Sequence, residues 1–494
     1  MKILFVYPDI EGVARYGARK FYHGLGYLSA VLKQAGHETA LLYVQQETPR
    51  EAFLAAVEDT GAQLVAFSTT THQHPYAVAQ ARWLQEARSE LTIVVGGVHA
   101  TLVPEQVVAE GCFDAVCVGE GEAALLDLVE RLEAGEDWAD LPGWWLRRGN
   151  EVIRNPLRPL LQDLDSLPFA DRELFAYDEI LQANGGWVDM MGGRGCPYDC
   201  SYCCNPGLKA RYRGLGKYVR LRSVENVLAE IAALCQRYPV RTINFQDDTF
   251  TLDRRWVLAF CTAYRGTCRL PFWINTRVER LDEEIVEALA AAGCQGVRIG
   301  VESGNEHLRQ EILKKRMSNA DILAAGRLLQ KHGLDLYTCN MIGVPGETPA
   351  MIEETIELNR RLQPRDLQFS VFYPYPMTEL YEVCRRGGYL QEGVSLPSYY
   401  GRQSVLRLPT LTAEELAMGY DRLEALRSEL ALKRRHPRRY RLRAFALWLV
   451  GGDPIRLERW LRPWRALRRL ARRLNPPPAA RRGEPPLNPA QGGG

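Results

Sequence analysis

The sequence predicts an α/β protein: a doubly wound parallel sheet at the amino terminus, then a partial (β/α)6 barrel, then a basic helical carboxyl-terminal arm. Three observations lead to this fold class. Short apolar segments alternate with helical patterns over residues 1–145, and a second series of the same kind runs from 187 to about 376. From Lys433 onward there are 17 basic and three acidic residues, a net charge of +14. Strand–helix alternation is typical of parallel sheets covered by helices on both faces.

The overall composition fits a globular protein. Of 494 residues, 46% are hydrophobic and 25% charged, which is ordinary for such chains. No apolar run approaches the roughly 20 residues that cross a membrane, and the opening MKILFVYPD indicates a buried strand without a signal-peptide pattern. We therefore expect a cytoplasmic protein, in which twelve cysteines need not form disulfides.

Residues 1–145 form the expected doubly wound domain. Its helix is predicted over 24–36, where apolar residues share one face and a glycine ends the pattern. Ligands of such sheets bind at the carboxyl ends of the strands. Small residues stand there, and glycines among them let backbone approach a bound group; they are Ser68, Gly96, Gly97, Gly119 and Gly121. The predicted strands are 2–8, 39–44, 63–70, 91–97 and 113–121.

Prolines and mixed polarity over residues 146–185 predict an extended linker. The barrel is expected over 186–400, because six strand–helix units fall short of the eight that usually take about 250 residues. In barrels the chemistry lies at the carboxyl ends of the strands. The six strands are predicted at 187–193, 242–248, 272–277, 296–304, 336–346 and 367–376.

Residues 401–474 are predicted to be a helical extension, and 475–494, rich in proline and glycine, a disordered tail. Within 456–474, Trp460, Trp464 and several leucines recur at helical spacing with arginines between them. This pattern is typical of a basic helix on an anionic membrane surface. It fits equally a helix packed on the barrel with its arginines in solvent. A nucleic-acid contact is not expected, since nothing else in the chain suggests one.

The segment MGGRGCPYDCSYCCNP, residues 191–206, carries the strongest chemical signal. Cys196, Cys200 and Cys203 have the spacing C-x3-C-x2-C, and thiolates bind soft metals and iron–sulfur clusters. Three ligands would leave one iron of a four-iron cluster open. A structural zinc site usually has four ligands in paired C-x2-C motifs, and no partner pair follows downstream. Cys204 does not fit the spacing, so we expect it to pack nearby.

CPYDCSYC resembles the signature of the radical S-adenosylmethionine (SAM) enzymes. The resemblance implies that Cys196, Cys200 and Cys203 bind a [4Fe–4S] cluster, whose open iron SAM would chelate. Tyr202 stands at the aromatic position, which in this family lies near the adenine. An electron from a donor such as flavodoxin or ferredoxin would cleave SAM and form a 5′-deoxyadenosyl radical.

Three later segments resemble the other SAM-binding motifs of the same family, each at a strand end. FQDDTF, residues 245–250, implies that Asp247 and Asp248 lie near the methionine group. Glu302 resembles the carboxylate that contacts the ribose. GVPGET, residues 343–348, resembles the segment beside the adenine, which implicates Gly343 and Gly346. Taken singly, the aspartates could be a solvated turn or helix cap, and the glutamate could serve an ion pair.

The amino-terminal domain, with GGVHATLVPEQ and VGEGEAAL, resembles the Rossmann-like cobalamin-binding domain of many such enzymes. The resemblance implies that Ser68 and the four glycines at the strand ends contact cobalamin. One departure is that residues 8–13, PDIEGV, lack the histidine of the D-x-H-x-x-G motif that ligates cobalt. The lower cobalt face would then be unligated or bound by water. His72 and His74 could approach it or simply belong to a polar loop, and the domain could also be a scaffold without cobalamin.

The resemblance as a whole implies a cobalamin-dependent radical SAM enzyme. The leading expectation is a methyltransferase that acts on an unactivated carbon or a phosphinate centre through a 5′-deoxyadenosyl radical and methylcobalamin. The alternatives are a cyclase or rearrangement enzyme of the same architecture, or a non-catalytic iron–sulfur or cobalamin sensor. The expected substrate is a small molecule. It would be lipid-like if residues 440–474 hold the enzyme at the inner face of the membrane.

Overall fold

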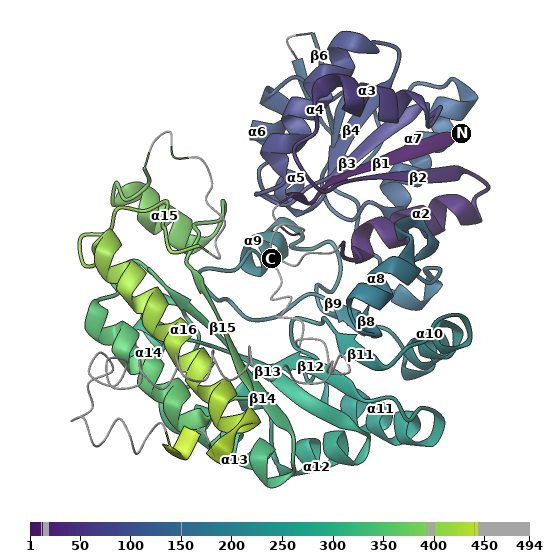
Figure 1. Ribbon diagram of the computed structural model, residues 1–494. Helices are drawn as coiled ribbons and strands as arrows, with labels where there is room; N and C mark the ends of the chain where they lie inside the picture. The colour runs from purple at the N-terminus through teal and green to yellow at the C-terminus, as the bar shows by residue number, and fades with distance from the viewer. Residues whose placement is uncertain are drawn as a thin grey trace, which may run out of the picture.

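The computed structural model describes residues 1–10, 12, 19–149, 151–391, 394, 401–438 and 440–442. Two α/β lobes lie side by side, with the short helix α9 (Asn205–Arg211) between them (Figure 1). The amino-terminal lobe contains a seven-stranded sheet, and the second lobe a six-stranded one. The fold class predicted from the sequence is confirmed for these two lobes.

The first sheet has the strand order β2-β1-β3-β4-β5-β6-β7. Its parallel strands are β1 (Lys2–Pro8), β2 (Glu38–Val44), β3 (Leu64–Ser68), β4 (Thr92–Gly96) and β5 (Ala115–Cys117). Both faces are buried: Ile3 and Phe5 enter one core, whereas Leu4 and Val6 enter another. The strand order reverses at β1 and β3, where doubly wound sheets bind ligands.

Helices cover both faces of this sheet. On one face lie α2 (His23–Gln34) and α7 (Glu122–Ala134), whose leucines join the same core as Phe5. The other face carries α3 (Arg50–Glu58), α4 (His74–Ala87), α5 (Val98–Leu102) and α6 (Pro104–Ala109). Helix α7 ends at Gly135, whose φ of 68° is the left-handed conformation that glycine adopts at helix ends.

The segment predicted to be an extended linker is largely structured, so this expectation was wrong. Strands β6 (Trp144–Arg148) and β7 (Glu151–Arg154) extend the first sheet with antiparallel pairing. A 3₁₀ turn (Glu173–Phe175) and helix α8 (Tyr177–Ala183) follow. Leu146 and Phe175 are buried in the core, which explains why this stretch is ordered despite its prolines. Residues 155–163 and 167–172 match the expected irregular conformation.

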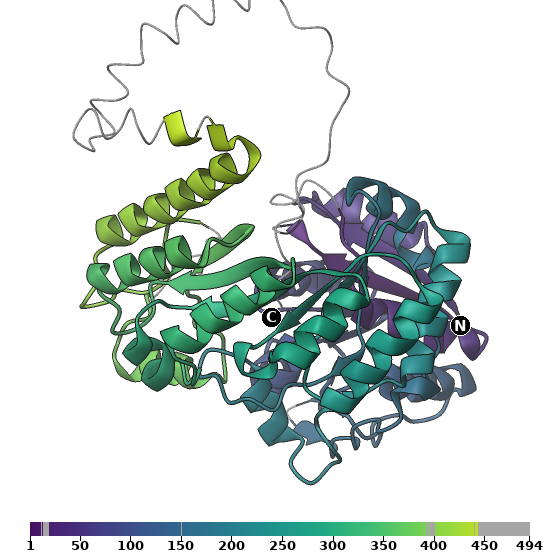
Figure 2. The same cartoon turned by 90° about the horizontal axis from the view of Figure 1, so that it is seen from below.

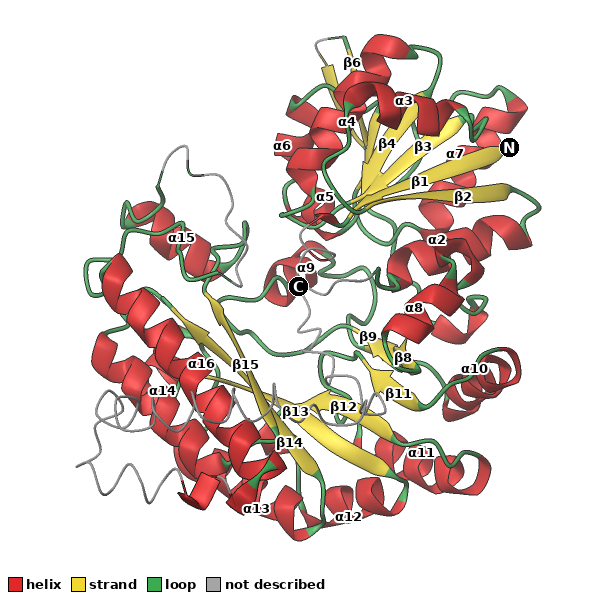
Figure 3. Cartoon of the chain, viewed as in Figure 1, coloured by secondary structure: helices red, strands yellow, loops and turns green. Residues whose placement is uncertain are grey.

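The second sheet is entirely parallel, with the order β15-β14-β13-β12-β11-β8. It curves into a partial barrel with its helices on the convex side (Figure 3). The strands are β8 (Trp187–Met190), β11 (Thr242–Phe245), β12 (Phe272–Thr276), β13 (Cys294–Glu302), β14 (Asp335–Ile342) and β15 (Asp366–Val371). All six strands predicted from the sequence are therefore present.

The barrel helices are α10 (Val224–Arg237), α11 (Arg254–Thr267), α12 (Glu283–Ala291), α13 (Asn319–Lys331) and α14 (Pro349–Leu362). Each begins after a Ser, Asp or Thr whose side chain accepts a backbone N–H of the first turn, which fixes the start of the helix. These caps are Ser223, Asp253, Asp282, Ser318 and Thr348. In the view from below, the helices run along the outside of the strands (Figure 2).

The carboxyl-terminal part contributes α15 (Glu379–Arg386) and the long helix α16 (Ala413–Arg435). Leu416, Leu423 and Leu426 of α16 pack on α14 and β15. The amphipathic segment 456–474 and the tail 475–494 lie outside the described residues. No helix in the described part of the chain is both long and apolar enough to cross a membrane.

Candidate active site

The cysteine loop leaves β8 and is held by a short pairing of β9 (Gly193–Arg194) with β10 (Arg220–Leu221). This pairing requires glycine on the loop side. A Cβ at Gly193 would lie 2.6 Å from the carbonyl oxygen of Arg220, and one at Gly195, whose φ is +86°, 2.4 Å from that of Tyr218. The glycines around the cysteines therefore allow two backbone segments to pack closely, which positions Cys196.

Each of the three predicted ligand cysteines has a polar neighbour at its sulfur. The Arg277 guanidinium donates to Cys200 Sγ at 3.4 Å. The Asn205 backbone N–H and side-chain amide donate to Cys203 Sγ at 3.4 and 3.5 Å. Cys196 Sγ lies 4.0 Å from Thr249 Oγ1. Donors directed at sulfur favour the thiolate form, which is the form that binds metal.

The electrostatics of the three thiols differ. Hydrogen bonds from Cys204 and Asn205 lower the pKa of Cys203, against the effect of burial. Burial raises the pKa of Cys196 and of Cys200, and for Cys200 the nearby Lys315 and Arg277 oppose that effect. Within the described ranges no three His, Cys, Asp or Glu side chains converge as ligands of one ion. A four-iron cluster does not need such convergence, because each thiolate binds a different iron.

Tyr202 and Glu302, which the sequence assigns to SAM, are in contact. The Tyr202 hydroxyl donates to Glu302 Oε1 at 3.0 Å, and Lys315 Nζ lies 2.8 Å from the same oxygen. Glu302 has a φ of +64°, beside a register shift in the pairing of β13 with β14. Strained backbone of this kind clusters at functional sites. Lys315 was not predicted, because it follows Glu302 in an irregular segment without a motif.

The pair Asp247 and Asp248 follows β11 on the cysteine side of the barrel. The Gly192 backbone N–H donates to Asp247 Oδ2 at 2.9 Å, and burial raises the pKa of Asp247 to about 7. The Asn205 amide donates to Asp248 Oδ2 at 3.1 Å and to Cys203. The helix-cap alternative does not hold, because Asp253 caps α11. Both aspartates instead brace the cysteine loop.

Gly343 and Gly346 form the turn after β14 and have positive φ angles of 79° and 83°. The Gly343 N–H donates to the carboxylate of Glu347, a side chain that is fully buried. Burial raises the pKa of Glu347 to about 8. The turn is therefore organised around a carboxyl group that is largely protonated at neutral pH.

This carboxyl group predicts a pH effect on stability. Glu347 has a higher pKa folded, about 8, than unfolded, about 4.3. Its stabilising contribution is therefore complete below the unfolded pKa and is lost as the pH rises toward 8. Between pH 5 and 8.5 the melting temperature of the wild type should fall more steeply than that of Glu347→Gln. Calorimetric melting of both proteins checks this, and parallel pH profiles would show that Glu347 is ionised in the folded state.

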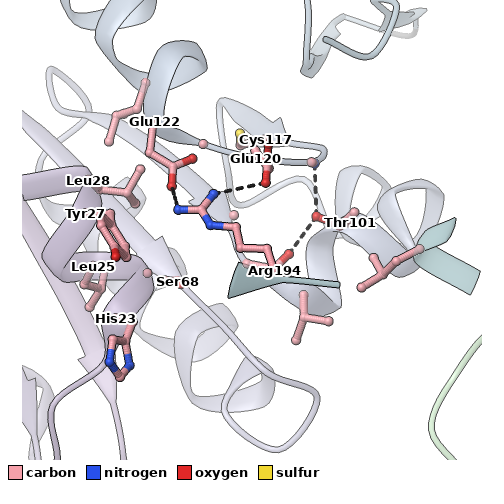
Figure 4. Close-up of a pocket in the computed structure, with 18 of the residues that line it drawn as sticks. His23, Leu25, Tyr27, Leu28, Ser68, Thr101, Cys117, Glu120, Glu122 and Arg194 are labelled. Atoms are coloured by element: carbon pink, nitrogen blue, oxygen red, sulfur yellow. Dashed lines mark hydrogen bonds and ion pairs between the residues drawn. The ribbon is translucent and has the colours of Figure 1, made fainter. Parts of the chain in front are cut away.

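A cavity of about 410 Å³ lies between the carboxyl ends of the first sheet and the cysteine loop (Figure 4). The barrel side contributes Cys204, Asn205 and Asp248 to its wall. The first domain contributes all five positions that the sequence assigns to cobalamin: Ser68, Gly96, Gly97, Gly119 and Gly121. Of the residues that the sequence assigns to the cluster and to SAM, only Asp248 lines this cavity, so the cavity borders the cysteine loop without reaching the three ligand cysteines.

Two of these glycines are needed for protein packing, whereas the sequence led us to expect that they let the backbone approach a bound group. Gly97 has a φ of +98°, and a Cβ there would lie 2.7 Å from the backbone of Thr69. Gly119 has a φ of +111°, and its Cβ would lie 2.1 Å from the Tyr212 hydroxyl. That hydroxyl accepts the backbone N–H of Glu120 at 2.8 Å. These glycines let protein segments pack together, and the cavity wall follows from that packing.

An ion-pair network that the sequence did not predict joins the two lobes beside the cavity. Arg194, two residues before Cys196, lies 3.0 Å from Glu120 and 2.6 Å from Glu122 (Figure 4). Arg220 lies 2.9 Å from Glu120 as well. Burial would raise the pKa of Glu120, but the two arginines lower it. A short sequence motif cannot reveal the network, because its partners come from different domains.

The histidines considered as cobalt ligands do not line the cavity. His72 Nε2 lies 3.0 Å from the Tyr375 hydroxyl of the barrel. His74 Nδ1 lies 3.3 Å from Thr69 Oγ1, and its Nε2 lies 3.0 Å from Glu110 Oε2. His23, which was not predicted, does line the cavity, and its Nε2 donates to the carbonyl oxygen of Asp189 at 3.2 Å. Burial lowers the pKa of His23 to about 4, so the ring is neutral.

Comparison with protein families agrees with this geometry. Residues 16–129 match the model of the B12 binding domain, and residues 190–358 match that of the radical SAM superfamily. The chain belongs to the cobalamin-binding radical SAM enzymes. Its cofactors are a [4Fe–4S] cluster, SAM and cobalamin. The protein is an enzyme, and not the non-catalytic sensor that the sequence also allowed. Which residues contact each cofactor stays a prediction.

Individual proteins are similar to this chain over most of its length. The enzyme is 27% identical to an uncharacterised methyltransferase of Pyrococcus horikoshii, over 84% of this chain and 90% of the other. It is also 27% identical to an anaerobic magnesium-protoporphyrin IX monomethyl ester cyclase of Cereibacter sphaeroides, over 78% and 64%. Among solved structures, the methyltransferase TsrM of Kitasatospora setae, with cobalamin and a [4Fe–4S] cluster bound, matches with a TM-score of 0.64, 20% identity and coverage of 85% and 84%.

The cavity predicts a spectroscopic result for bound cobalamin. Neither His72 nor His74 lines it, and His23, which does, uses its Nε2 for the carbonyl oxygen of Asp189. The cobalt(II) spectrum should therefore show no splitting from a protein nitrogen. Electron paramagnetic resonance of the reduced, cobalamin-loaded enzyme tests this. A nitrogen splitting that disappears in His23→Phe would show instead that His23 reaches the cobalt.

Proposed function

We propose that the enzyme transfers a methyl group from SAM to an unactivated carbon or a phosphinate centre of a small molecule. The observation that carries this proposal is the shared cavity. It is lined by the strand ends of the cobalamin-binding domain and by residues that flank the three cysteines, among them Gly195 and Cys204. Methyl transfer of this kind needs both cofactors to face one substrate, and proximity is a large part of such catalysis.

We assign Cys196, Cys200 and Cys203 to the cluster, and the donors at their sulfurs fit that role. Tyr202, Asp247, Asp248, Glu302, Gly343 and Gly346 are assigned to SAM. The buried pair of Glu302 with Lys315 would orient the polar groups of SAM. When bound, the cluster and SAM supply a radical that removes a substrate hydrogen atom, and cobalamin carries the methyl group.

On the cobalamin side, Ser68, Gly96, Gly97, Gly119 and Gly121 are assigned as contacts, because they all line the cavity. Arg194, Glu120 and Arg220 would hold this wall at a fixed distance from the cysteine loop. Charged side chains that are largely buried and paired resist displacement, because breaking one pair leaves a buried charge. The network therefore acts as a spacer between the two cofactors.

The second candidate is a radical cyclase or rearrangement enzyme without methyl transfer. The similarity to a cyclase supports it, because this chain is 27% identical to that cyclase and also 27% identical to the archaeal methyltransferase. Either reaction needs an electron donor, for which we propose flavodoxin or ferredoxin. The proposed peripheral membrane contact through residues 440–474 concerns a segment outside the described residues, and it rests on the sequence pattern alone.

Product analysis distinguishes the two candidates. The reconstituted enzyme is incubated anaerobically with methyl-deuterated SAM, a reductant and fractionated small molecules of the source cell. Methyl transfer predicts a product heavier by a trideuteromethyl group, with S-adenosylhomocysteine and 5′-deoxyadenosine formed together. A cyclase would yield 5′-deoxyadenosine alone, and that result would refute the methyltransferase assignment.

A further inference from the structure

The inside of the barrel carries a second polar centre, away from the cysteines. Along β13 the side chains alternate, so Val297 and Ile299 pack in the outer core while Arg298 points to the other face. Arg298 Nη1 donates to Asn244 Oδ1 of β11 at 2.6 Å, across the intervening strand β12. Such a contact is possible only on the concave side of the sheet. Arg298 therefore lies inside the barrel.

Aromatic rings surround this arginine. Trp273 and Tyr337 form a small cluster separate from the outer core. The Arg298 guanidinium carbon lies 5.2 Å from the centre of the Trp273 ring and 5.8 Å from that of Tyr337. All three side chains are at least nine-tenths buried. They form what we call the floor of the barrel interior: Trp273 and Tyr337 lie in the first halves of β12 and β14, and Arg298 lies at the middle of β13.

The charge on the floor is incompletely matched. Arg298 contacts two neutral amides, Asn244 at 2.6 Å and Asn275 at 3.5 Å, and the one carboxylate that acts on it, Asp189, does so without a direct contact. Asp189 lies on the far side of Asn244, and its Oδ1 accepts from that amide and from Gln246. A buried charge is costly unless it is paired, so this arginine is poised for an anion.

Three donors on the floor lack an acceptor. The Arg298 Nε, the Trp273 indole nitrogen and the Tyr337 hydroxyl are buried and make no hydrogen bond within the described chain. Buried polar groups in native proteins almost always have partners. Because two of these groups can only donate and the third readily does, the missing partner is a group with several acceptor oxygens.

The interior above the floor is open to solvent. Side chains on the cofactor side of Arg298 keep partial exposure; they are Gln246, Cys339, Gln368 and Ser370. Arg298 precedes Glu302 by four residues on β13, which corresponds to about 13 Å along the strand. A ligand bound at the floor would therefore extend toward the SAM residues.

We propose that the substrate carries an oxyanion, a carboxylate or a phosphate-type group, that docks on Arg298, Trp273 and Tyr337 at the barrel floor. This inference rests on the proposed function, since it names the substrate class of the same reaction. Arginine binds both oxyanions through paired N–H donors. An amine would be repelled by Arg298, and a purely apolar tail would leave all three donors unsatisfied. The reacting atom then lies about 13 Å from the anion, beside the cofactors.

Calorimetric titration of the full chain, loaded with cluster, SAM and hydroxocobalamin, tests the proposal. Inorganic phosphate and propionate serve as separate probes, and one or both should bind saturably. Arg298→Met should weaken that binding at least about tenfold, since it removes the charge-assisted bonds. Trp273→Phe and Tyr337→Phe each remove one donor while keeping a ring, and each should weaken it about threefold. Arg254→Met is the control, because Arg254 lies on the surface beside Asp282 and Glu284.

The probes also identify the class of anion: tighter binding of phosphate indicates a phosphate-type group, and tighter binding of propionate a carboxylate. Failure of both probes to bind the wild type overturns the proposal, as does unchanged binding in Arg298→Met and both ring variants. Cluster content, cobalamin content and substrate-free SAM cleavage are measured in the same preparations. If these are normal while anion binding is absent, the floor assignment fails and the proposed function stands.

Discussion

Replacing Cys203 with alanine should reduce SAM cleavage by more than about a hundredfold. Loss of a residue that merely hydrogen-bonds to a metal ligand already costs about 10–100-fold, and loss of the ligand itself costs more. Cys203 is the thiol whose pKa is lowered by donors from Cys204 and Asn205, so it is the most readily ionised of the three. Iron content and 5′-deoxyadenosine formation are measured after anaerobic reconstitution. Cys196→Ala and Cys200→Ala should behave in the same way.

The adjacent Cys204 provides a matched control. It lies next to Cys203 but outside the C-x3-C-x2-C spacing, and Asn205 would still donate to Cys203 without it. Cys204→Ala should therefore keep its iron and cleave SAM within about threefold of the wild type. Full cleavage by Cys203→Ala, or iron loss only in Cys204→Ala, would mean that the ligands are assigned to the wrong thiols.

Substituting Gly119 with alanine should lower cobalamin uptake by at least about tenfold, since overpacking commonly costs about 1–3 kcal/mol. The new Cβ would lie 2.1 Å from the Tyr212 hydroxyl, which holds the backbone of Glu120. The wall of the cavity would have to move. Uptake of hydroxocobalamin, measured by absorbance after gel filtration, gives the affinity.

Two variants separate the clash from backbone strain. Gly135 has a positive φ of 68°, and a Cβ added there would have no atom within 4 Å. Gly135→Ala therefore adds strain without a clash and should bind cobalamin normally. Tyr212→Phe, combined with Gly119→Ala, removes the clashing oxygen and should restore part of the uptake. Equal losses in Gly119→Ala and Gly135→Ala would point to general destabilisation.

The features that the sequence predicted correctly are local in the chain. Apolar runs such as 2–8 form buried strands wherever they fall, and both sheets were therefore foreseen. The cysteine spacing and the segments around Asp247 and Glu302 are likewise local, because each belongs to one strand and the loop after it. Family comparison then confirmed the cofactors that those motifs imply.

The features that were missed depend on contacts between distant segments. Arg194 pairs with Glu120 across 74 positions, and Lys315 reaches Tyr202 across 113. No spacing rule connects such residues. The supposed linker was misjudged for a similar reason: its prolines were visible, but the burial of Leu146 and Phe175 depends on a core built by other elements. The surroundings of Arg298 likewise come from neighbouring strands that are distant in the sequence.

The central claim is that one cavity brings SAM-derived methyl chemistry and cobalamin together. The most direct measurement needs no substrate: the reduced, cobalamin-loaded enzyme is incubated anaerobically with methyl-deuterated SAM, and the cobalamin is extracted in the dark and weighed by mass spectrometry. We expect cobalamin that carries a trideuteromethyl group, with an equal amount of S-adenosylhomocysteine. Unmodified cobalamin, with 5′-deoxyadenosine as the sole SAM product, would contradict the claim.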